Sequence, residues 1–157
     1  MPTISPKKAT LLLNIIWVGL LTGTLDALAA LILNHKIGAA VIFRFIASGV
    51  FGKAAFTGGS EMVISGVVFH FLIAYLFTTA YYLIYPFFKS SLKNKYVIAL
   101  VYGAFAWLIM NLLVVPLSKI GMHPIKAMNI LTGVAALIIC IGLPIALSAD
   151  RYYSKKR

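Results

Sequence analysis

Four hydrophilic side chains stand inside long apolar stretches of the sequence, where their chemistry is unusual. Asp26, His70, Asn111 and Asn129 are each surrounded by aliphatic and aromatic residues. In hydrocarbon, a carboxylate, imidazole or amide group is costly unless it meets a partner or lines a cavity. Intramembrane carboxylate and imidazole groups can exchange protons or bind cations. These residues are therefore the first candidates for a functional site.

The stretches that carry them are each long enough to cross a bilayer. A spanning helix needs about 20 apolar residues, and the stretches cover residues 11–33, 60–85, 96–117 and 125–149. Hydrophobic residues make up 62% of the 157-residue chain and charged residues 11%, which excludes an ordinary water-soluble domain. The sequence predicts a single all-α domain, an integral membrane bundle of four spanning helices.

The connection between the first two stretches contains a further apolar segment. Residues 37–56 are apolar enough to enter lipid, but they include Arg44 and Lys53 as well as several glycines. The spacing of the two cations places them on opposite faces of a continuous helix. We therefore expect a short helix that lies in the interface or re-enters the bundle. A fifth full span is the alternative.

Depth along the helices predicts that the polar residues share one layer. Because neighbouring spans run antiparallel, all four fall in the half of the bundle farther from the termini, at depths of about 6 to 15 Å at 1.5 Å per residue. A carboxylate at that depth needs a partner, so we expect Asp26 to pair with His70 or Arg44. The predicted buried polar cluster consists of Asp26, His70, Asn111, Asn129 and Arg44, with Glu61 near its mouth.

Glycines mark the faces along which the helices should pack. Gly19 and Gly23 form a GxxxG pair on the stripe that carries Asp26. Gly66 and Gly133 lie on the polar faces of the second and fourth stretches. Small residues let neighbouring backbones approach closely, which stabilises helix association in lipid. We expect packing within one bundle, with a dimerisation face at the GxxxG pair as the alternative.

The net charge of +11 arises from basic residues that flank the apolar stretches. Flanking cations meet anionic head groups and set orientation, so we expect membrane lipids as partners and no nucleic acid. The side richer in Lys and Arg is normally cytoplasmic, which predicts that both termini face the cytoplasm. That side holds Lys7, Lys8, Lys89, Lys93, Lys95, Arg151, Lys155, Lys156 and Arg157, and the other holds Lys36, Arg44, Lys53, Lys119 and Lys126.

The first stretch also has features of a secretory signal peptide. Lys7 and Lys8 precede an apolar run, and residues 27–29 form a small-x-small triplet of the kind found at cleavage sites. The apolar run continues through Leu33, beyond the usual length of a signal's apolar core. The sequence therefore favours an uncleaved spanning helix, with the cleaved form as the alternative.

Motifs for catalysis, metals and cofactors are missing from the sequence. His35, His70 and His123 are scattered, without a metal-ligand spacing. The lone Cys140 offers neither a disulfide within the chain nor a thiolate metal site. Neither a GxSxG elbow nor a phosphate-binding loop occurs. We expect no catalytic residue, metal or cofactor.

Three runs of sequence resemble a known group of proteins: FRFIASGVFGKAAFTGG, VFHFLIAYLFTTAYYLIYP and YGAFAWLIMNLLVVPLS. They resemble a widespread, uncharacterised group of small bacterial membrane proteins that is distantly similar to YagU-type inner-membrane proteins. Members of that group share a His in the second span and a third span that contains Asn and ends in Pro-Leu. These features correspond here to His70, Asn111, Pro116 and Leu117. The resemblance implies a four-helix protein of the bacterial cytoplasmic (inner) membrane and carries no substrate or reaction.

Three functional interpretations follow from the sequence. The first is a structural or accessory membrane component, in which the polar residues join helices by hydrogen bonds. The alternative is a small oligomeric transporter or channel that uses Asp26 and His70 to exchange protons or bind a cation. An enzyme acting on a lipid or quinone is the weakest of the three. A homo-oligomer or another membrane partner is compatible with each. A cavity reaching Asp26 would favour transport, and a fully paired cluster would favour the structural role.

Overall fold

The computed structural model describes residues 6–122 and 127–154, and within these ranges its regular elements are all helices. Helical stretches long and apolar enough to cross a membrane cover Thr10–Leu33, Ser60–Leu92, Lys95–Leu117 and Ala127–Ser154. Large apolar side chains cover their outer faces; for example, Leu83 is 70% exposed and Leu117 is 79% exposed. Such a surface suits lipid and not water. The chain is a multi-pass membrane protein. Its four apolar helical stretches confirm the predicted all-α four-helix bundle.

The first two spans are single helices, and the last two are each interrupted by a π-helical segment. The first span is α1 (Pro6–Leu33) and the second is α4 (Ser60–Leu92). The third consists of α5 (Lys95–Ile109), the π segment η1 (Met110–Val114) and α6 (Val115–Leu117). The fourth consists of α7 (Ala127–Leu137), the π segment η2 (Ile138–Gly142) and α8 (Leu143–Ser154). The short helices α2 (Ala39–Phe51) and α3 (Ala54–Thr57) connect α1 to α4.

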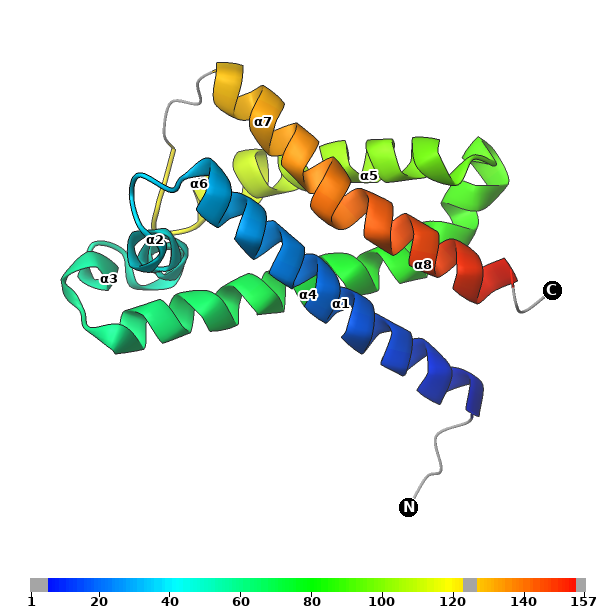
Figure 1. The fold of residues 1–157 in the computed structure, drawn as a ribbon, viewed down its shortest axis with the longest axis horizontal. Coiled ribbons are helices and arrows are strands. Elements are labelled where there is room, and N and C mark those ends of the chain that lie inside the picture. The colour runs from blue at the N-terminus through cyan, green and yellow to red at the C-terminus, as the bar shows by residue number, and fades with distance from the viewer. Residues whose placement is uncertain (1–5, 123–126, 155–157) are drawn as a thin grey trace.

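The spans have two distinct ends (Figure 1). The start of α1, the turn between α4 and α5 and the end of α8 lie at one end, which we call the termini end. The helices α2, α3 and α6 lie at the opposite end, which we call the far end. α1 packs against α4, η2 and α8, and α5 packs against α4 and the whole fourth span. The four spans therefore enclose a common interior.

Helix α2 lies across the far end of the bundle. It is seen end-on in Figure 1, whereas the spans run across the view. Its 13 residues extend about 20 Å, less than the roughly 30 Å of bilayer hydrocarbon, so α2 is not a fifth span. α2 packs on α4 at Gly66, where a Cβ atom would overlap the carbonyl of Phe43. Its Gly49 carbonyl also accepts a hydrogen bond from the Lys119 amide at 2.9 Å.

Helix α4 continues beyond residue 85, although Pro86 lies inside it. A proline lacks the amide hydrogen that would reach the carbonyl four residues earlier, which here belongs to Tyr82. The Tyr153 hydroxyl of α8 donates to that Tyr82 carbonyl at 2.7 Å. The helix therefore passes through Pro86 because another helix satisfies the orphaned acceptor. α4 ends where Lys93 takes a left-handed conformation with φ 54°.

Prolines also explain the two π segments. η1 ends at Val114, two residues before Pro116, and η2 ends at Gly142, two residues before Pro144. A helix can widen locally to adjust the carbonyls that a proline leaves without donors, and π segments of this kind recur at functional sites. Each of the last two spans therefore contains an irregular turn in its interior.

The predicted packing glycines all lie against side chains or backbone of a neighbouring helix. A Cβ atom on Gly23 would lie 2.8 Å from the Phe71 ring, and one on Gly19 would overlap Tyr75. The GxxxG pair therefore faces α4 of the same chain. Gly66 meets α2 as described above, and a Cβ on Gly133 would lie 2.7 Å from Nε1 of Trp107.

The tightest core lies in the half of the bundle near the termini end. Tyrosines of α4, α5 and α8 fill it, and Tyr81, Tyr82 and Tyr85 are fully buried. The rings pack edge to face or stacked, with the Tyr81 and Tyr102 centroids 4.5 Å apart, a favourable aromatic geometry. The core also contains Ile98, Ile141, Ile145, Ala146 and Ala149. We refer to this part as the tyrosine half.

Candidate functional site

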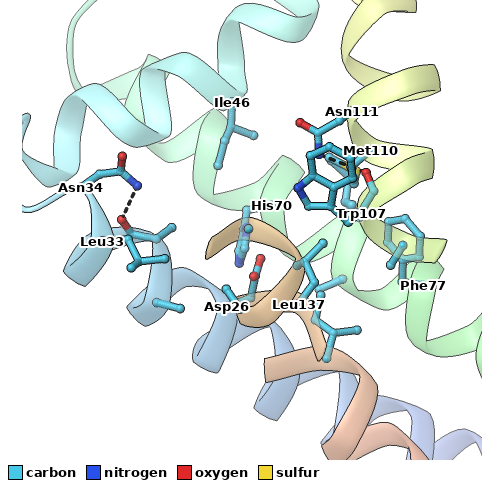
Figure 2. Close-up of a pocket in the computed structure, with 18 residues that line it drawn as sticks. Asp26, Leu33, Asn34, Ile46, His70, Phe77, Trp107, Met110, Asn111 and Leu137 are labelled. Carbon is cyan, nitrogen blue, oxygen red and sulfur yellow. Dashed lines mark hydrogen bonds between the residues drawn. The ribbon is translucent and has the colours of Figure 1, made fainter. Parts of the chain in front are cut away.

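A pocket of about 310 Å³ lies between the four spans, in the half nearer the far end. Figure 2 shows the side chains that surround it. Its polar lining consists of Asp26 and Asn34 from the first span and its end, His70 from α4, and Asn111 with Trp107 from the third span. This volume falls in the range of small-molecule sites in proteins. We refer to this part as the pocket half.

Asp26 supplies the negative charge of the pocket. It lies late in α1, and its carboxylate points toward His70 (Figure 2). The two groups are close enough to interact electrostatically. Within residues 6–122 and 127–154, no hydrogen bond or ion pair to the Asp26 carboxylate is found. Asp26 is half-buried, so its carboxylate is open to the pocket and is not satisfied by the described residues.

His70 is held in place by α1 and by aromatic neighbours. Its Nε2 lies 2.7 Å from the Gly23 carbonyl oxygen. A carbonyl oxygen only accepts hydrogen bonds, so Nε2 carries the hydrogen and Nδ1 is the nitrogen that can gain or lose a proton. The rings of Phe43 and Phe71 meet the imidazole edge to face, with centroids 6.4 and 5.4 Å away. The imidazole is therefore fixed beside Asp26.

The two amides of the lining also donate to backbone carbonyls. Asn111 Nδ2 donates to the Trp107 carbonyl at 3.0 Å, and Asn34 Nδ2 donates to the Ala30 carbonyl at 2.9 Å. In the described part of the chain, neither Oδ1 atom accepts a hydrogen bond. Each amide therefore has an Oδ1 atom that can accept a hydrogen bond from a ligand.

The remaining lining is apolar, and small residues make the space. Residues with little or no side chain leave the interior unfilled, namely Ala29, Ala30, Gly133 and Ala136. Larger apolar side chains form the walls: Leu33, Ile46, Ile73, Phe77, Met110, Leu137 and Ile141. Asn111 and Met110 belong to η1, and Ile141 belongs to η2. Both π segments therefore contribute to the site.

The pocket is closed toward the termini end and extends toward the far end. Phe77 and Ala106 of its lining lie one turn from Tyr81 and Tyr102 of the buried core. In the other direction the lining reaches Asn34, which is exposed and lies about 12 Å beyond Asp26 along the helix axis. The site therefore extends from Asp26 toward the far end.

Three residues of the predicted cluster lie together in the pocket, and three lie elsewhere. Asp26, His70 and Asn111 line it. Asn129 is exposed in the first turn of α7, where interfacial water or head groups can serve its amide.

Arg44 and Glu61 are both hydrogen-bonded to Gly59 at the far end and do not lie at Asp26. Arg44 Nη2 donates to the Gly59 carbonyl at 3.4 Å, and Glu61 Oε1 accepts from the Gly59 amide at 2.6 Å. Because α2 lies across the bundle, it directs Arg44 toward the start of α4. The expected pairing of Asp26 with Arg44 is therefore not found.

Trp107 and Asn34 line the pocket but were not among the predicted site residues. Trp107 shares a helical face with Asn111 one turn away, a spacing that could have indicated its role. Asn34 follows the last residue of α1, and its position relative to the pocket depends on how α1 ends.

Chemically, the site can hold charge and accept hydrogen bonds. Among the described residues, no group of three or more His, Cys, Asp or Glu side chains could hold a metal ion. Asp26 and His70 together can exchange a proton or hold one positive charge.

Comparison of the chain with protein-family models, with curated proteins and with solved structures found no match.

Proposed function

We propose that this membrane protein is a transport component that binds a small solute in the pocket, with Asp26 and His70 as the groups that exchange a proton or hold a cation. The carrying observation is the carboxylate of Asp26, which faces the pocket beside His70 and accepts no hydrogen bond from the described residues. A carboxylate that only joins helices would be expected to have its hydrogen bonds satisfied.

The shape of the site supports transport over a purely structural role. The pocket extends toward one end of the bundle and is blocked by the tyrosine half at the other. Transporters bind near the middle of the membrane and open to one side at a time, and irregular backbone often borders their sites. Here η1 and η2 border the pocket. Opening of the tyrosine half would complete the pathway.

Location and orientation belong to the same proposal. We place the protein in the bacterial cytoplasmic membrane with both termini in the cytoplasm, on the basis of its sequence resemblance and of its basic residues. In this orientation the pocket extends toward the outside of the cell, and the tyrosine half lies on the cytoplasmic side.

Charge movement in purified protein tests the proposal. Proteoliposomes adsorbed on a solid-supported membrane would receive a sudden pH change, and the transient current would be recorded. We expect a current from the wild-type protein, because a proton binds within the membrane field. Asp26→Asn should abolish most of it, and Asp150→Asn, which alters a carboxylate outside the pocket, should preserve it.

The matched variants also separate transport from the structural interpretation. If Asp26→Asn and His70→Ala give wild-type currents and change only thermal stability, the transport proposal fails and the structural role is favoured.

A further inference from the structure

We infer that the solute of the pocket is a small organic cation with an apolar body, whose positively charged nitrogen lies beside Asp26. This inference rests on the proposed function and names the class of its ligand.

Four of the five polar residues of the pocket lining have an acceptor that no described residue uses, and the fifth is Trp107. His70 donates through Nε2 to Gly23, and Asn34 and Asn111 each donate through Nδ2 to a carbonyl of their own helix. The acceptors left over are the Asp26 carboxylate, two amide Oδ1 atoms and, when the imidazole is neutral, His70 Nδ1, and the one indole donor of the lining is Nε1 of Trp107. A ligand that matches several acceptors and one negative charge carries donors or a positive charge.

Among the described residues, no Lys or Arg lines the pocket to neutralise Asp26, and His70 is the basic side chain beside it. Arg44 contacts Gly59 at the far end, and Lys89 and Lys95 pair with Asp150 at the termini end. The lining residues include neither Lys nor Arg. When the His70 imidazole is neutral, a ligand cation would supply the positive charge that the described residues do not.

The walls favour an organic cation over an inorganic one. Apart from the four acceptor-bearing residues and Trp107, the lining is hydrocarbon, thioether or glycine, which cannot replace the water shell of a small metal ion. The indole of Trp107 and the ring of Phe77 also line the space, and aromatic rings attract organic ammonium groups. An ammonium with an apolar body matches both the charge and the walls.

Equilibrium dialysis of the full-length protein in nanodiscs tests the inference. The probes would be radiolabelled benzyltrimethylammonium, its neutral isostere neopentylbenzene and the anion phenylacetate. Empty nanodiscs would correct for partition into lipid. We expect saturable binding of the cation and none of the other two, because only the cation pairs with Asp26.

Variants would assign the binding to the pocket. Asp26→Asn should weaken cation binding at least about tenfold, because a charge pair in a poorly solvated site is lost. Trp107→Leu retains the carboxylate and should also weaken binding, through loss of the indole. Trp17→Phe is the matched control, since Trp17 is 63% exposed and Trp107 only 8%, and it should bind like the wild type.

Each outcome has a defined meaning. Saturable binding of the neutral isostere or the anion as tight as that of the cation overturns the ligand class. So does cation binding that survives both Asp26→Asn and Trp107→Leu. Failure of all three probes with persistent Asp26-dependent currents overturns the ligand class alone, whereas loss of both binding and currents overturns the proposed function as well.

Discussion

The tyrosine half and the pocket half of the bundle use polar groups in opposite ways. In the tyrosine half, the hydroxyls of Tyr82, Tyr85 and Tyr102 form hydrogen bonds to Ser148, Asp150 and the Phe77 carbonyl at 2.9, 2.9 and 2.6 Å. In the pocket half, His70, Asn34 and Asn111 donate to backbone carbonyls, and their remaining acceptors face the pocket. The hydrogen-bond partners of these groups distinguish those that join helices from those that face the pocket, although the buried Tyr81 hydroxyl of the tyrosine half has no partner among the described residues.

Asp26 and Asp150 show the contrast most clearly. Asp150 accepts from Tyr85 and Lys89, lies 3.7 Å from Lys95, and so joins α8 to both α4 and α5. Asp26 has no hydrogen bond or ion pair within the described residues and interacts only electrostatically, with His70 and Cys140. A carboxylate that is fully engaged stabilises the fold, whereas one without donors does not.

The largest predicted effect breaks the backbone contact that holds the tyrosine half together. A Cβ atom on Gly142 would overlap the Ala99 carbonyl, so Gly142→Ala should lower the free energy of unfolding by about 1 to 3 kcal/mol. Gly49→Ala is the control, because its Cβ would make ordinary contacts of 3.6 Å or more. Titration with sodium dodecyl sulfate would measure both, and equal stability of the two variants would contradict the packing described.

The second prediction compares the two aspartates directly. Asp150→Asn should lower the free energy of unfolding by about 1 to 2 kcal/mol, because it weakens charge-assisted bonds that are partly exposed. Asp26→Asn should leave stability unchanged or raise it, since a carboxylate without donors is replaced by a neutral amide. Thermal unfolding in detergent would measure the difference. Destabilisation by Asp26→Asn as large as that by Asp150→Asn would remove the contrast between the halves.

A smaller effect is expected at the proline inside α4. Tyr153→Phe removes the donor to the Tyr82 carbonyl and should cost about 1 kcal/mol. In a Pro86→Ala background the restored amide can serve that carbonyl, so the same substitution should cost less. A double-mutant cycle measures this coupling. Additive effects would show that Tyr153 does not compensate for Pro86.

The spans and part of the site could be predicted because both follow from local sequence. Length and hydropathy define helices in a membrane, and antiparallel counting brings Asp26, His70 and Asn111 to similar depths. Depth does not determine the direction of a side chain around the helix axis. Asn129 shares the expected layer but lies exposed.

Other features depend on contacts between distant segments. The position of Arg44 could not be predicted from the sequence, because the orientation of α2 is set by its contact with Gly66 of α4. The continuation of α4 through Pro86 depends on Tyr153, far away in sequence. The π segments precede Pro116 and Pro144, but a proline in a spanning helix is equally compatible with a simple kink.

The availability of the Asp26 carboxylate is tested most directly by its reaction with dicyclohexylcarbodiimide, which modifies protonated carboxyl groups in apolar surroundings. The chain contains three Asp and Glu residues, so mass spectrometry of the labelled protein can assign each adduct. We predict modification of Asp26 and protection of Asp150 by its Lys89 and Tyr85 contacts. Modification of Asp150 with no adduct on Asp26 would contradict a free carboxylate in the pocket.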